Sequence, residues 1–118
     1  MIRPSGAVRI HLYRQPVDMR KAINGLVSIV EAEIGADPFS ADLFVFCNRT
    51  RTLVKMVGWE GNGFVLWMKR LEDSRFKWPL SGSEAVVQLT VQEINWLLDG
   101  YPLTVTRANG ALPHHRVL

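Results

Sequence analysis

The chain has 118 residues, of which 47% are hydrophobic, and this composition excludes an intrinsically disordered protein and suits one globular domain. A single cysteine excludes an intramolecular disulfide, and no apolar run approaches the roughly 20 residues that span a bilayer. The formal net charge of +3 is mildly basic.

We expect one domain over residues 1–107 and a loosely ordered tail over residues 108–118, where the hydrophobic periodicity stops. The first six residues hold no apolar core of the kind that a secretory signal needs. We therefore expect a cytoplasmic protein with no membrane association.

A strand and a helix are predicted first. Residues 8–13 alternate apolar and polar side chains, which is the period of a half-buried strand. An amphipathic helix follows, with Asp18 as its N-cap and Gly35 as its stop. Its apolar stripe consists of Met19, Ile23, Leu26, Val27, Val30 and Ile34.

Three strands are predicted next. Residues 43–48 predict a central strand, because the apolar run is unbroken up to Cys47. Residues 52–59 and 64–71 flank a glycine-rich turn and predict a β-hairpin that pairs Trp59 with Phe64. A slip by one residue would exchange its two faces, so the sequence leaves open which face is exposed.

The closing elements are two short strands and a helix. Residues 76–78 and 85–89 predict the strands, and Thr90-Val91-Gln92-Glu93 forms a capping box before a helix that Gly100 ends. The order strand, helix, strands, helix predicts an α+β fold. We expect an antiparallel sheet of four to five strands with two helices packed on one face.

No catalytic or metal site is predicted. His11, His114 and His115 have no cysteine or acidic cluster near them in sequence, and the five aspartates stand where caps and turns need them. The glycines of residues 58–63 lie between two strands and not before a helix, which excludes a phosphate-binding loop. Cys47 is predicted to be buried and inert. We expect no enzyme activity and no cofactor.

Positive charge is concentrated between residues 49 and 77, which suits an anionic partner and equally an ordinary solvated sheet face. In residues 69–79 cations alternate with aromatic side chains, a mixture that suits nucleic acid because rings stack on bases and cations neutralise phosphates. An alternative stays open, in which Phe76 and Trp78 point into the core while Arg75 and Lys77 point out. The candidate residues for binding DNA or a protein partner are Arg49, Arg51, Lys55, Trp67, Lys69, Arg70, Arg75 and Lys77. We expect three or more of the cations from Lys55 onward to share one exposed patch.

An ordered set of short motifs extends from about Arg3 to Gly100. The motifs are Asp18-Met19-Arg20-Lys21, Gly25-Leu26, Asp37-Pro38-Phe39-Ser40, Leu43-Phe44-Val45-Phe46, Asn48-Arg49, Lys55, Trp59-Glu60-Gly61, Gly63, Lys69-Arg70-Leu71-Glu72, Arg75-Phe76, Trp78-Pro79 and Leu89-Thr90. Together they resemble the accessory protein that the second open reading frame of IS-sixty-six-type bacterial insertion sequences encodes. Ala22 and Ser74 depart from that family's glycines, and Cys47 takes a position that is often basic.

The resemblance implies a non-catalytic helper of DNA transposition, encoded beside a separate transposase. Together with the charge pattern, this leads us to expect that the protein binds element DNA, the transposase or both through the basic hairpin and residues 69–77. A homo-oligomer is also open. One alternative is a protein-only assembly factor of the transposase complex, with Trp59, Trp67 and Trp78 at its interface. Another is a stand-alone single-strand nucleic-acid binding module, and the scarcity of free carboxylates disfavours a small nuclease.

Overall fold

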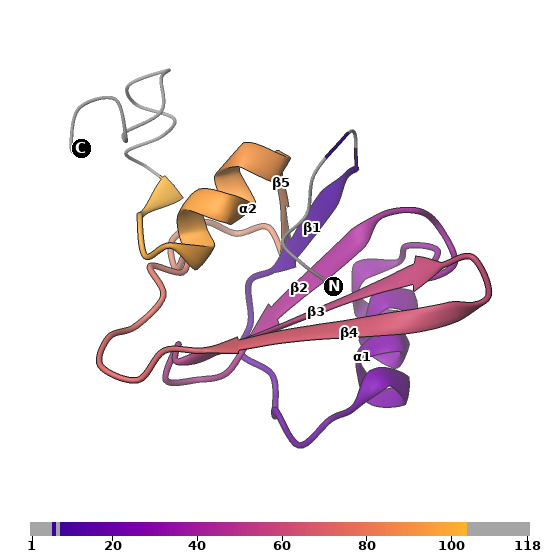
Figure 1. Cartoon of the computed structure of the whole chain (residues 1–118), viewed down its shortest axis with the longest axis horizontal. Helices are drawn as coiled ribbons and strands as arrows, with labels where there is room; N and C mark the ends of the chain where they lie inside the picture. The colour runs from indigo at the N-terminus through magenta and orange to yellow at the C-terminus, as the bar shows by residue number, and fades with distance from the viewer. Residues whose placement is uncertain (1–5, 7, 104–118) are drawn as a thin grey trace.

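The computed structural model describes residue 6 and residues 8–103, so the tail expected over residues 108–118 lies outside the described residues. Five strands form one sheet in the order β4-β3-β2-β1-β5 (Figure 1). The strands are β1 (Ile10–Tyr13), β2 (Leu43–Cys47), β3 (Leu53–Glu60), β4 (Gly63–Arg70) and β5 (Val86–Leu89). The helices are α1 (Ile23–Ile29), which continues as the π-helix η1 (Val30–Ile34), and α2 (Val91–Leu98). The predicted α+β fold is confirmed.

The sheet is mixed. Strands β1 and β2 run parallel, with Ile10 opposite Leu43, whereas the other neighbouring strands run antiparallel. The sequence predicted antiparallel pairing throughout. The difference arises because α1 and η1 connect β1 to β2, and a helical crossover returns the chain in the same direction. Residues 76–78 form no strand. Hydrogen bonds from Phe76 to Arg51 and from Trp78 to Tyr13 hold them at one end of the sheet.

Apolar clusters cover both faces of the sheet. On one face, Phe44 and Phe46 of β2 pack with Leu26 of α1. On the other face, Val45 of β2 packs with Leu97 of α2. The expectation that both helices lie on one face is therefore wrong. Successive side chains of a strand point to opposite faces, so a strand that is apolar at every position has to be covered twice.

Helix α1 begins later than the sequence predicted. The carboxylate of Asp18 does not cap the helix, because it accepts hydrogen bonds from the backbone N–H and the guanidinium of Arg20. The N-cap is Ala22, which makes no side-chain capping bond. The predicted stop is confirmed, since Gly35 ends η1 with a left-handed φ of 71°.

The predicted hairpin register is confirmed, with Trp59 opposite Phe64. Gly61 occupies the first central position of the two-residue turn at a φ of 62°. Glycine at that position is typical of a type II′ turn, whose twist matches that of the flanking strands.

The predicted capping box is also present. The hydroxyl of Thr90 accepts from the N–H of Glu93 at 3.1 Å, and the Glu93 carboxylate accepts from the N–H of Thr90 at 2.9 Å. Two backbone donors that a helix start leaves unpaired are thereby satisfied.

Leu26→Ala should lower the free energy of unfolding by about 2–5 kcal/mol, because Leu26 is fully buried and the shorter side chain leaves a cavity. Leu80→Ala is the control, since Leu80 is 63% exposed and its loss should change the stability by less than about 0.5 kcal/mol. Urea unfolding followed by circular dichroism measures both. Equal midpoints for Leu26→Ala and the parent protein would contradict this packing.

Candidate nucleic-acid interface

Lys55 lies on the α1 face of the sheet and is only 8% exposed. Its Nζ donates hydrogen bonds to the carbonyl oxygens of Met19 at 2.8 Å and Lys21 at 3.0 Å. In a helix that began after Asp18, those oxygens would accept from helix N–H groups. The Nζ of Lys55 binds these two carbonyl oxygens instead, which explains the late start of α1. These bonds also keep the Lys55 cation buried below the surface.

Lys69 is also bound internally, on the opposite face of the sheet. Its Nζ donates to the carbonyl oxygen of Leu98 at 2.8 Å, at the C-terminal end of α2, where the helix dipole favours a cation. Trp67 lies on the same face as Lys69 and packs half-buried against the core. Arg70 is exposed and pairs with Glu72 at 3.0 Å. Lys55 and Lys69 therefore cannot contribute to the expected exposed patch.

The remaining four predicted cations come from two chain segments that lie side by side. Arg49 and Arg51 belong to the β2–β3 turn, and the backbone N–H of Phe76 donates to the carbonyl oxygen of Arg51 at 2.7 Å. This bond places Arg75 and Lys77 next to the turn. We call Arg49, Arg51, Arg75 and Lys77 the basic rim.

Residues 75–78 follow the alternative that the sequence left open. Phe76 and Trp78 are 1% and 6% exposed, whereas the side chains of Arg75 and Lys77 are exposed. The aromatic rings of this segment pack in the core, and its cations face outward.

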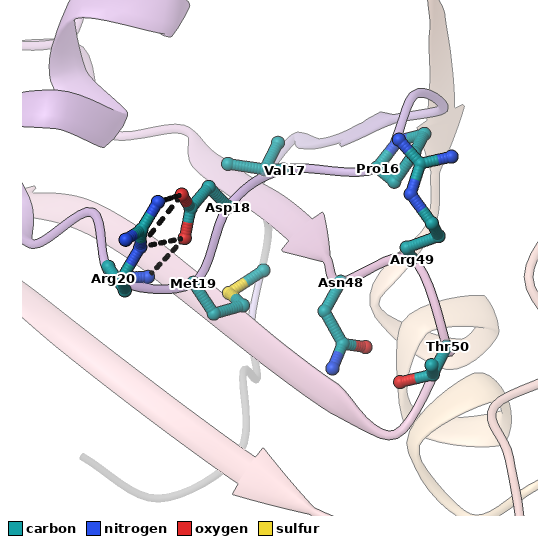
Figure 2. A pocket seen from close by; sticks show the side chains of 8 residues that line it. All are labelled: Pro16, Val17, Asp18, Met19, Arg20, Asn48, Arg49 and Thr50. Atoms are coloured by element: carbon teal, nitrogen blue, oxygen red, sulfur yellow. Dashed lines mark hydrogen bonds and ion pairs between the residues drawn. The ribbon is translucent and has the colours of Figure 1, made fainter.

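Three adjoining hollows lie along the basic rim. The first, of about 650 Å³, lies between residues 16–20 and the β2–β3 turn (Figure 2). It shares Pro16, Asn48 and Arg49 with a second hollow of about 180 Å³. The second shares Arg51, Trp78 and Leu80 with a third of about 500 Å³. The shared residues place the three hollows next to one another at this end of the sheet.

The lining of these hollows is strongly cationic. Among its described residues Asp18 is the one acid, and the bases are Arg14, Arg20, Arg49, Arg51, Arg75 and Lys77. Figure 2 shows Asp18 and Arg20 paired on one side of the first hollow, with Arg49 on the other. The guanidinium of Arg20 lowers the pKa of Asp18 to about 2, so this pair is ionised and neutral overall at pH 7.

Arg14 builds the wall of the second hollow. It is 9% exposed, and its guanidinium donates to the carbonyl oxygens of Pro79 at 3.1 Å, Glu84 at 2.7 Å and Ser81. Sequence reasoning missed Arg14 and Arg20 as site residues. For Arg14, no local pattern shows that a cation after β1 binds a loop some 65 residues later. In the described part of the chain, the four side chains of the basic rim have no ion-pair partner.

Comparison with known proteins identifies the family. Residues 8–108 match the family model described as IS66 Orf2 like protein. The chain belongs to the IS66 Orf2-like family. Two relatives come from Sinorhizobium fredii (strain NBRC 101917 / NGR234), and both bear the description uncharacterized protein. One, y4jC, is 35% identical over 104 residues, covering 88% of each chain. The other, y4hO, is 33% identical over 98 residues, covering 82% of this chain and 84% of its own. No solved structure matches the chain.

Membership confirms the resemblance found in the sequence and gives the protein an accessory role in the transposition of an insertion sequence. IS66 Orf2-like proteins are accessory proteins and not known enzymes. Residues 6 and 8–103 contain no group of three histidine, cysteine or acidic side chains that could hold a metal ion. Over the same residues, none of the helices has the length and apolar character needed to cross a membrane.

Lys55→Met should lower the free energy of unfolding by about 1.5–3 kcal/mol, because it leaves two backbone carbonyls without their charged donor. Lys77→Met removes an exposed cation of the basic rim and should change the stability by less than about 0.5 kcal/mol. Urea unfolding compares the two variants. Equal effects would show that the internal bonds of Lys55 contribute nothing to stability.

Cys47 should resist thiol reagents in the folded protein. Burial raises the pKa of its thiol to about 12, so the reactive thiolate is scarce at every pH well below that value. Ellman's reagent at about pH 8 should therefore react only after unfolding in guanidinium. Immediate reaction of the folded protein would mean that Cys47 is reached from the second hollow.

Proposed function

We propose that the protein assists transposition by holding the sugar–phosphate backbone of element DNA on the basic rim. The observation that supports this most is the convergence of Arg49, Arg51, Arg75 and Lys77 around adjoining hollows without carboxylate partners among the described residues. Such cations neutralise phosphates and release condensed counterions, which supplies most of the affinity of sequence-independent binding.

The contacts are to phosphates and not to bases. The two aromatic residues that line these hollows, Phe76 and Trp78, are buried and offer no ring for stacking. This disfavours the stand-alone single-strand module, because such modules stack bases on exposed rings. Phosphate contacts position a protein on DNA without reading sequence. We infer a non-catalytic subunit that acts in the cytoplasm, while the separate transposase carries out strand transfer.

A protein-only assembly factor is the second candidate, and one surface feature favours it. Phe39 is 56% exposed, yet its ring lies 5.0 Å from that of Trp59 and 5.4 Å from that of Phe64. The carboxylate of Asp37 accepts from the N–H of Phe39 at 2.9 Å and fixes the loop. Exposed aromatic rings held in place are typical of protein interfaces. The β3–β4 turn next to this aromatic cluster and the β2–β3 turn of the basic rim lie at opposite ends of the sheet (Figure 1). Trp78 belongs to the core instead.

DNA affinity should fall steeply with salt. Four phosphate contacts predict a slope of log K against log salt of about −3.6, and so a loss of about 150-fold between 50 and 200 mM salt. Replacing Arg75 and Lys77 together with alanine should reduce the slope to about −1.8. Fluorescence anisotropy with labelled element-end DNA measures both slopes.

The matched control replaces Arg9 and Lys21 with alanine, because this pair removes the same charge from exposed positions outside the basic rim. Its slope should equal that of the parent protein. Equal losses in the two double variants would mean that net charge alone drives binding. If the parent protein does not bind at the lower salt, the DNA role is contradicted. The assembly factor would then stand, and Phe39→Ala should reduce capture of the transposase.

A further inference from the structure

Strand β4 forms one edge of the sheet and is long and apolar for an edge strand. It has eight residues, whereas β5 at the other edge has four. Residues 64–68 are all uncharged and apolar. The outer N–H and C=O groups of an edge strand can pair with another strand, and natural proteins usually prevent this.

Two of the usual protections, proline and a β-bulge, are absent from β4, and its charged side chains are confined to its last two residues. It contains no proline, and its register with β3 continues over all eight residues without a bulge. Its two charged side chains, Lys69 and Arg70, are bound to Leu98 and Glu72. The first six residues of β4, Gly63 to Met68, carry no charge that would repel a second strand.

Alternate residues of β4 turn their backbone groups outward. The N–H of Leu71 donates to the carbonyl oxygen of Thr52 at 2.8 Å, which directs the odd-numbered residues toward β3. Phe64, Leu66 and Met68 consequently present their N–H and C=O groups to the outside. The side chain of Met68 is itself 58% exposed.

We propose that β4 pairs in antiparallel orientation with β4 of a second copy of this chain, joining two five-stranded sheets into one. The two-fold axis of such a pair is perpendicular to the sheet, so each face continues across the interface. Residues that meet must then point to the same face, which restricts the register to pairs of equal parity.

The register with the axis through Leu66 matches apolar side chains on both faces. Leu66 meets Leu66 of the second copy, and Phe64 meets the exposed Met68. On the other face Val65 meets Trp67. This self-complementarity of a single strand identifies a second copy, and not an unrelated strand, as the occupant of the edge.

The charges also suit this register. Lys69 meets Gly63 of the second copy, and Arg70 meets Asn62 of the second copy. No cation therefore faces a cation or an apolar side chain. An axis through Trp67 would instead place Lys69 against Val65. Antiparallel pairing also puts the two basic rims at opposite ends of the joined sheet, where chains of net charge +3 repel each other least.

The first experiment measures mass in solution without DNA, so its failure is distinct from a failure of the proposed DNA binding. At about 100 µM the parent protein should have twice the chain mass of 13.4 kDa by light scattering. Met68→Lys alters two contacts per interface and should weaken the dimer about 100-fold. Leu80→Lys, at an equally exposed apolar residue outside β4, should leave the dimer intact. A monomeric or polydisperse parent protein, or a folded Met68→Lys variant with an unchanged dimer, would overturn the proposal.

The second experiment tests the register by cross-linking under mild oxidation. Leu66→Cys places two Cα atoms about 5.5 Å apart across the axis, within the range of a disulfide. Val65→Cys leaves its copies about 7–8 Å apart on the diagonal. A covalent dimer should form with Leu66→Cys alone, because the buried Cys47 thiol does not react. No cross-link with Leu66→Cys, or a stronger one with Val65→Cys, would overturn this pairing.

Discussion

Strand β2 is apolar at every position, and its side chains leave the sheet on both sides. Phe44 and Phe46 need cover on one face, which α1 and η1 provide. Val45 and Cys47 need cover on the other, which α2 and residues 76–78 provide. The parallel β1–β2 pair follows from the same constraint, because the helix that covers the first face is also the connection between the two strands. The two-sided cover of β2 thus accounts for the placement of the helices on opposite faces of the sheet and for the inward aromatic side chains of residues 76–78.

Three cations hold distant segments together. Lys55 fixes the chain before α1, Arg14 fixes residues 79–84, and Lys69 joins β4 to the end of α2. Each donates to backbone carbonyls, and hydrogen bonds from charged donors are stronger than neutral ones. The basic composition is thus divided between cations that stabilise the fold and those of the basic rim. The sequence pI of about 9.4 therefore overstates the charge that a ligand can reach.

Sequence reasoning succeeded where a feature depends on neighbouring residues. The capping box at Thr90 and the hairpin register each rest on a few adjacent positions. Asp18 has the chemistry of a cap, yet the helix start depends on Lys55, more than 30 residues away. Within the candidate site, Arg49, Arg75 and Lys77 are exposed, Arg51 is half-buried, and their role in binding stays a prediction. Parity along a strand could not separate them from Lys55 and Lys69, because it does not show what packs above each face.

The position of β1 inside the sheet has a consequence for the order of folding. Ile10 pairs with Leu43 on one side and with Leu89 on the other, 33 and 79 positions later. The β3–β4 hairpin needs only its own residues and can form as soon as it leaves the ribosome. Strand β1 is synthesised first, and its second neighbour, β5, is the last of the five strands to be synthesised. The nascent chain therefore carries β1 with one open edge, the edge that later pairs with β5, until almost all of the described residues have been synthesised, and closing the sheet is a late, long-range step.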